Sequence, residues 1–110
     1  MDLRHLADLL AEQSAFGKPY LEFLRSDALS VGLYVLRAGQ IDRQQPHGEA
    51  EIYVVMSGRA LFTAGDETRD VGPGDTLFVA AGVAHRFHDI TQDLQLIVVF
   101  APPEGSTATD

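Results

Sequence analysis

The chain has 110 residues, 45% of them hydrophobic and 22% charged, which is ordinary globular composition and gives room for one hydrophobic core. Sixteen Asp and Glu against eight Lys and Arg give a formal net charge of -8, which disfavours nucleic acid and anionic membranes as partners. Cysteine is absent, no apolar run approaches the roughly 20 residues that span a bilayer, and no basic and then apolar leader opens the chain, so we expect a cytoplasmic protein without disulfides or Cys-bound metals.

The N-terminal segment is predicted to be helical and the rest of the chain to be β-structure. Leucines at helical spacing over residues 2–14 predict a short amphipathic helix, within a lead-in that covers residues 1–19. After Gly17 and Pro19 the chain breaks into short runs of strand-forming residues, punctuated by Gly, Asp and Pro. The predicted strands are residues 20–25, 29–37, 41–47, 50–56, 59–64, 67–71, 75–80, 84–88 and 93–100.

Turn residues agree with an antiparallel arrangement of these strands. Ser57-Gly58, Gly65-Asp66 and the segment 72–75 are typical of connections between hairpin strands. We therefore predict an all-β barrel or sandwich over residues 20–101. The Pro-, Gly-, Ser- and Thr-rich segment 102–110 is expected to be a flexible tail.

Two stretches carry residues that suit a metal or acid–base site. Gln45, His47 and Glu51 share the parity of one strand face if no bulge intervenes, and Gly82 supplies a turn that leads His85 onto the next strand. His88 has the opposite parity to His85, so we expect it to point out of the barrel. An inward Glu51 would need a metal or a proton, because burying an unpaired carboxylate costs several kcal/mol.

Both stretches resemble the two sequence motifs of the cupin superfamily. The first motif matches at Gly39, Gln45, His47, Glu51 and Gly58, with Gln45 in place of the usual first His. The second motif matches at Gly74, Ala80, Gly82, His85 and Asp89, with Ala80 and Asp89 as departures from Pro and Asn. The fifteen residues 59–73 separate the motifs, as in small single-domain cupins.

The resemblance implies a double-stranded β-helix, or jelly-roll, barrel with a short N-terminal helix. It also implies a divalent metal held by His47, Glu51 and His85, which would be the catalytic residues as well. Two imidazoles and one carboxylate favour Fe(II), with Mn, Ni, Co or Zn as alternatives. Gln45 would be a fourth ligand through its amide oxygen, or would orient a substrate or a water molecule.

Several other residues near the motifs receive ordinary structural interpretations. Glu49 has the parity of the site and could be a ligand or a base, but a solvated position at the barrel mouth is expected. Arg43 could hold a substrate carboxylate at the mouth, but an ordinary surface position is expected. The same two interpretations, substrate contact or an ordinary structural role, apply to Tyr53. The aromatic residues Tyr34, Phe78 and Phe87 are expected to pack in the core, and Gly58, Gly74 and Gly82 to form turns.

Three functions remain open from the sequence. The first is a metal-dependent oxygenase, lyase or isomerase acting on a small organic molecule. The second is a non-catalytic barrel that binds a small ligand, and the third is a metal-free cyclase, dehydratase or epimerase that uses the same His and Glu residues. A homodimer is expected in each case, because pairing covers exposed sheet edges.

Overall fold

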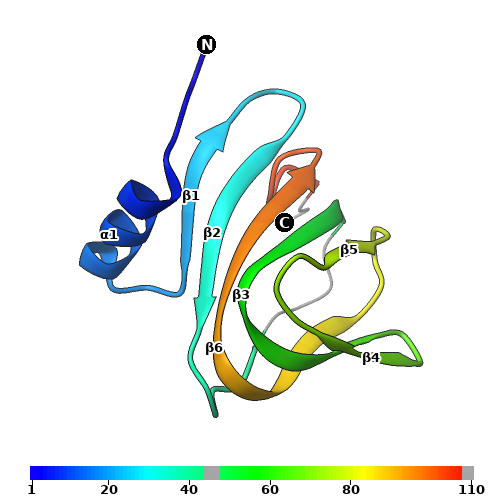
Figure 1. The fold of residues 1–110 in the computed structure, drawn as a ribbon. Coiled ribbons are helices and arrows are strands. Elements are labelled where there is room, and N and C mark those ends of the chain that lie inside the picture. The colour runs from blue at the N-terminus through cyan, green and yellow to red at the C-terminus, as the bar shows by residue number, and fades with distance from the viewer. Residues whose placement is uncertain (44–47, 108–110) are drawn as a thin grey trace.

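The strands form one antiparallel sheet that curls into a barrel. The computed structural model describes residues 1–43 and 48–107. Its strand order is β1-β2-β6-β3-β4, with β5 paired to β3, so the prediction of an all-β fold is confirmed. The elements of the described residues are α1 (Leu6–Phe16), β1 (Tyr20–Arg25), β2 (Ser30–Leu36), β3 (Ala50–Ala64), β4 (Glu67–Val71), β5 (Thr76–Val79) and β6 (His85–Ala101) (Figure 1).

The barrel closes through two long paired strands, β3 and β6. They pair from Ala50–Ala101 at one end to Ala64–His85 at the other. The first part of β3 also pairs with β5 and its second part with β4, and the register shifts between Val55 and Leu61 mark bulges. Bulges bend a strand and increase its twist, so both strands curve around the interior (Figure 1).

The predicted hairpin turn at Ser57-Gly58 is wrong, because both residues lie inside β3. Gly58 has a φ of 101°, and a Cβ built on it would lie 2.3 Å from the carbonyl oxygen of Asp93. Glycine is therefore required at a bulge where β3 and β6 approach closely. The predicted strands 50–56 and 59–64 are thus parts of one continuous strand, β3, and the predicted strands 84–88 and 93–100 are likewise parts of one strand, β6.

Other predicted boundaries differ by smaller amounts. The helix begins at Leu6, because the His5 side chain accepts the Ala7 N–H at its start, and it ends at Gly17, which has a φ of 77°. Residues 41–43 are not in a strand, and the remainder of the predicted strand 41–47 lies outside the described residues. The turns at Gly65-Asp66 and at residues 72–75 are confirmed.

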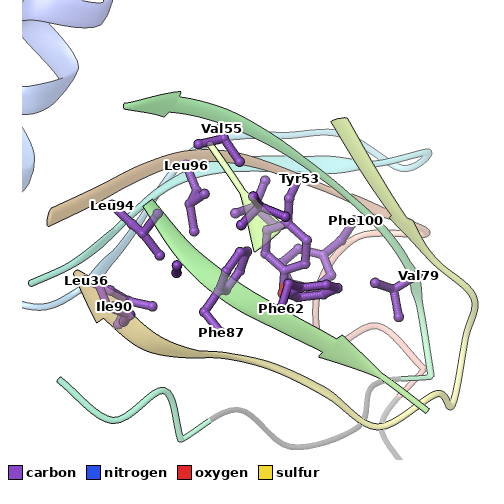
Figure 2. Close-up of a cluster of buried hydrophobic side chains, with 13 residues drawn as sticks. Leu36, Tyr53, Val55, Phe62, Val79, Phe87, Ile90, Leu94, Leu96 and Phe100 are labelled. Atoms are coloured by element: carbon purple, nitrogen blue, oxygen red, sulfur yellow. The ribbon is translucent and has the colours of Figure 1, made fainter. Parts of the chain in front are cut away.

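Aromatic side chains fill the barrel interior. Phe87 is fully buried and lies 5.1 Å from Tyr53 and 4.6 Å from Phe62 between ring centroids. Figure 2 shows these rings together with Val55, Leu94 and Leu96 in one cluster. On β2, Leu36 belongs to this cluster, whereas Leu33 is on the opposite face and is buried on the side where β2 meets α1. The helix thus covers part of the outer sheet surface.

The segment after β6 is held against the barrel. The Glu104 N–H donates to Ser30 Oγ at 2.8 Å, and the Gly105 N–H donates to Glu49 Oε1 at 3.0 Å. The Thr107 hydroxyl also donates to Glu49 Oε2, and Pro103 is buried. Residues 102–107, which we expected to form most of a flexible tail, thus make specific contacts in the structure. In the parts of the chain that the structure describes, no helix is long and apolar enough to cross a membrane.

Candidate metal centre

The barrel brings Glu51 and His85 together from opposite ends of the sheet. Glu51 is near the start of β3, whereas His85 pairs with Ala64 at the end of that strand. Closure of the barrel nevertheless places His85 Nε2 2.8 Å from Glu51 Oε1, and the two side chains are only 2% and 1% exposed. Both residues therefore face inward, as their positions in the sequence predict.

The orientation of the His85 ring is fixed by its other nitrogen. Nδ1 lies 2.8 Å from the Val83 carbonyl oxygen, which only accepts, so Nδ1 is the protonated donor. Nε2 points toward Glu51 and also lies 3.1 Å from the Tyr53 hydroxyl. A backbone carbonyl on one ring nitrogen is the arrangement by which proteins orient the other nitrogen toward a metal.

The environment of His85 favours a proton on Nε2 when no metal is bound. Burial lowers the pKa of His85, but the hydrogen bonds to Glu51 and to the Val83 carbonyl, together with the charges of Glu51 and Asp42, outweigh burial. The pKa of His85 is therefore raised above its ordinary value of 6.5. A protonated His85 would compensate a charged Glu51 beside it.

Two of the four predicted ligands cannot be placed in the structure. Gln45 and His47 lie outside the described residues. Within residues 1–43 and 48–107, no group of three or more His, Asp or Glu side chains is arranged to hold a metal ion. The structure thus brings Glu51 and His85 together and leaves the roles of Gln45 and His47 as predictions.

The donor set of Glu51 and His85 fits a divalent cation. Two ligand atoms bound at about 2.1 Å and at right angles on one ion are about 3.0 Å apart, close to the 2.8 Å between Nε2 and Oε1. A metal would replace the Nε2 proton as the positive partner of the buried carboxylate, because ligand groups release protons when they bind a metal. The two described residues are therefore compatible with the metal that the motifs imply.

Two further acidic residues, Glu49 and Asp42, are buried, and their burial was not predicted from the sequence. Glu49 is buried, at 4% exposure, and accepts hydrogen bonds from Gly105 and Thr107, so its predicted solvation is wrong. Asp42 was not singled out, yet it is equally buried and accepts from the Tyr34 hydroxyl at 2.7 Å and the Phe87 N–H at 2.9 Å. No spacing signal marks Asp42, because its partners lie on two different strands, β2 and β6, and no local pattern contains both.

The remaining candidates divide between the interior and the surface. Phe87 is buried in the core and Arg43 is exposed, as expected, and Tyr53 is also buried in the core. Phe78 is 68% exposed on β5, so the prediction that it packs in the core is wrong. His88 does point away from His85, toward Thr63 on the outer face.

Sequence comparison decides the family. A family model described as "Cupin domain" matches residues 32–100. The chain belongs to the cupin family. This cupin is 52% identical over 100 residues to the uncharacterized protein SCO3923 of Streptomyces coelicolor, a match that covers 91% of this chain and 95% of that protein.

Solved structures agree with the fold. An RmlC-like cupin family protein with a double-stranded β-helix fold, from Methanocaldococcus jannaschii, matches with a TM-score of 0.69 and 18% identity over 76% of this chain and 78% of the other. The DMSP lyase DddQ from Ruegeria pomeroyi matches with a TM-score of 0.68 and 24% identity. That match covers 88% of this chain and 52% of DddQ. The predicted double-stranded β-helix is confirmed.

Proposed function

We propose that this cupin binds a divalent metal ion inside the barrel and uses it in an enzymatic reaction on a small organic molecule. The observation that carries the proposal is the buried pair of Glu51 and His85, with Nε2 and Oε1 2.8 Å apart and Nδ1 of His85 anchored to the Val83 carbonyl. Fe(II) is the favoured ion, and Mn, Ni, Co or Zn suits the same ligand types.

Glu51 and His85 would hold this ion together with His47 and, through its amide oxygen, Gln45. The last two are assigned from motif spacing alone. When bound, the ion would supply Lewis-acid polarisation of a substrate oxygen or, as Fe(II), a centre for oxygen chemistry. The reaction class is therefore an oxygenase, or a lyase or isomerase.

The chain's own residues would shape the reaction space. The Val83 carbonyl keeps the His85 ring in one orientation. The Tyr53 hydroxyl lies 3.1 Å from His85 Nε2, where it could accept a proton from that nitrogen or donate one to it. The rings of Tyr53 and Phe62 pack against His85 at centroid distances of 5.9 and 6.1 Å. Such an apolar wall excludes bulk water and strengthens electrostatic interactions inside the barrel.

The similar fold of DddQ is that of a lyase. Because the identity is only 24%, this likeness supports a barrel able to house such chemistry and carries over neither the substrate nor the mechanism. We therefore keep lyase and isomerase reactions beside oxygenation in the proposal.

A metal-free acid–base enzyme is the second candidate, and one contact favours it. Glu51, His85 and the Tyr53 hydroxyl already form a buried group with separations of 2.8 and 3.1 Å at Nε2. A carboxylate, an imidazole and a phenol at these distances suit proton transfer in a cyclase, dehydratase or epimerase.

Metal content separates the two candidates. The protein is purified without chelators and analysed beside Glu51→Gln, His85→Asn and the control His5→Asn, which keeps a good N-cap residue at the start of α1. We expect near-stoichiometric metal in the wild type and the control, and at least a tenfold loss of affinity in the two site variants. Substoichiometric metal that is unaltered in Glu51→Gln and His85→Asn would favour the metal-free enzyme.

The role of Gln45 has its own test. Imidazole is a stronger donor than an amide oxygen for these ions, so Gln45→His is expected to retain metal more tightly during dialysis if residue 45 is a ligand. Unchanged retention would assign Gln45 to the substrate instead.

Turnover separates an enzyme from a non-catalytic barrel. If the metallated protein binds small acids, enols or phenols without consuming them or oxygen, the protein is a non-catalytic ligand-binding barrel.

The proposal includes a small-molecule ligand, a cytoplasmic location and a homodimer. The charge of -8 supports the exclusion of nucleic acid and anionic membranes as partners. Sedimentation equilibrium would test the homodimer, and a monomer at micromolar concentration would contradict it.

A further inference from the structure

A second group of reactive side chains lies on the outer face of the barrel. Phe62 on β3 pairs with Phe87 on β6, and both rings point into the core. Because side chains alternate along a strand, their neighbours Thr63 and His88 point outward. Thr63 is flanked in register by Thr68 on β4 and by Arg86 on β6.

Hydrogen bonds link these outward side chains in one direction. The carboxylate of Asp89 only accepts, so His88 Nδ1 donates to Asp89 Oδ2 at 2.7 Å. Nε2 of His88 then accepts from the Thr63 hydroxyl, also at 2.7 Å. The Thr68 hydroxyl, 2.7 Å from Thr63 Oγ1, is left as the donor of that pair. A hydroxyl thus faces a base whose second nitrogen is held by a carboxylate.

The backbone at Asp89 is part of this arrangement. Asp89 has a φ of 48°, and among the described residues it is the only non-glycine residue with a positive φ. That conformation is sparsely populated outside glycine, although Asp and Asn tolerate it better than other residues. It turns the Asp89 carboxylate back onto the ring of the preceding residue, and strain of this kind concentrates at functional sites.

A surface pocket borders this group. The pocket has a volume of about 370 Å³ and is lined by residues 39–42 and 86–90, which include His88 and Asp89, and Thr63 is the hydroxyl partner of His88 beside it. The side chain of His88 is 19% exposed and that of Asp89 is 71% exposed. Arg86 is exposed and lies directly across from Thr63 on the neighbouring strand. A cation that reaches the hydroxyl from this position would stabilise negative charge that develops there.

We propose that Thr63, His88 and Asp89 form a hydrolytic site for small carboxylic esters on the outer face of the barrel, separate from the candidate metal centre. Thr63 is the nucleophile and His88 the general base, and Asp89 is a positioning residue that fixes the His88 tautomer. The order hydroxyl, imidazole, carboxylate and the two 2.7 Å contacts carry the assignment.

The reaction proceeds in two balanced steps. Thr63 Oγ1 forms a bond to the ester carbonyl carbon and its proton passes to His88 Nε2, after which the bond to the leaving alcohol breaks and the alcohol takes that proton. Water then attacks the acylated Thr63 and gives a proton to His88. The bond between the acyl carbon and Thr63 Oγ1 breaks, the proton returns to Thr63, and the carboxylic acid is released.

Acylation by p-nitrophenyl acetate tests the proposal. The full-length protein is mixed with the ester, release of p-nitrophenol is followed, and the acetylated residue is located by peptide mass spectrometry. We expect acetyl on Thr63, and rates about 100-fold lower in Thr63→Val and His88→Gln, in line with the loss of a nucleophile or general base. Thr63→Ser keeps the hydroxyl and is expected to retain acylation. Thr76→Val is the matched control, because Thr76 is exposed on β5 opposite Val54.

The pH profile tests the positioning role of Asp89. Asp89→Asn keeps a residue that tolerates positive φ but replaces the carboxylate that holds Nδ1, so we expect a lower acylation rate and a displaced pH midpoint with an unchanged melting temperature. Acetyl found only on lysines, on the N-terminal amine or on His88 would overturn the proposal. Equal rates of Thr63 acetylation in the wild type and His88→Gln would also overturn it.

Discussion

Three carboxylate side chains are buried among the described residues, and each has different partners. Asp42 accepts from Tyr34 and the Phe87 N–H, Glu49 accepts from Gly105 and Thr107, and Glu51 lies against His85. Burying a carboxylate is costly unless donors or a cation compensate it. Motif spacing identified only Glu51, because Phe87, Gly105 and Thr107 are distant in sequence from the carboxylates that they contact, and no local pattern contains them.

The Tyr34–Asp42 contact predicts a loss of stability in alkali. Burial, then the hydrogen bond to Asp42, raises the pKa of Tyr34 well above its ordinary value of 10.0. The neutral phenol is thus favoured by folding, and its contribution is complete below pH 10 and is lost as the pH rises toward the folded pKa. Denaturant unfolding between pH 8 and 11 is expected to show a free energy of unfolding that falls above about pH 10.

Tyr34→Phe provides the matched variant. It removes the ionisable group, so its free energy of unfolding is expected to fall less steeply above pH 10. Some slope remains, because burial also raises the pKa of Tyr20. Identical pH slopes in the two proteins would contradict the assignment.

Asp42→Asn is expected to destabilise the protein by about 1.5–3 kcal/mol at pH 7 in denaturant unfolding, since it weakens the two hydrogen bonds that the buried Asp42 side chain accepts.

Most strands were predicted from their alternating polarity, but a glycine inside β3 was predicted to be in a turn. The predicted ranges 20–25 and 67–71 coincide with β1 and β4. Gly58 follows Ser57 and looks like a hairpin turn, but it serves a bulge in β3 whose need for glycine depends on the backbone of β6. A contact between residues 58 and 93 has no signature in either local stretch.

Gly58→Ala tests this interpretation. A Cβ at residue 58 would meet the Asp93 carbonyl oxygen at 2.3 Å, and the backbone has a φ of 101°. Gly65→Ala is the control, because Gly65 also has a positive φ, 61°, but nothing lies within 4 Å of its added Cβ. Both variants are expected to lose about 1–3 kcal/mol from backbone strain, and Gly58→Ala is expected to lose clearly more. Equal melting temperatures for the two would contradict a close approach at Gly58.

At the scale of the whole molecule, the segment after β6 joins distant parts of the barrel. Composition predicted mobility for residues 102–110, because Pro, Gly, Ser and Thr form no apolar pattern. The contacts of residues 104–107 with Ser30 and Glu49 are hydrogen bonds to single buried side chains, which composition does not encode. The fold and the inward pair Glu51–His85 were predictable because they follow from motifs and strand parity.

Glu49→Gln is expected to loosen this segment. The variant replaces one acceptor oxygen with an amide donor that faces either the Gly105 N–H or the Thr107 hydroxyl, at a cost of about 1–3 kcal/mol. Hydrogen exchange at the Gly105 amide is expected to accelerate by about tenfold or more. The control is Glu67→Gln, whose exposed ion pair with Arg69 contributes little. Unchanged exchange at Gly105 in Glu49→Gln would show that Glu49 does not hold the segment.

The proposed metal site inside the cupin barrel contains the buried Glu51–His85 pair. The most direct measurement is X-ray absorption at the metal edge of the Fe(II)-loaded protein, compared with His85→Asn and the control His5→Asn. We expect imidazole scattering from more than one ligand in the wild type and the control, and the loss of one imidazole in His85→Asn. A spectrum of His85→Asn identical to that of the wild type, or a wild-type spectrum without imidazole scattering, would contradict the account.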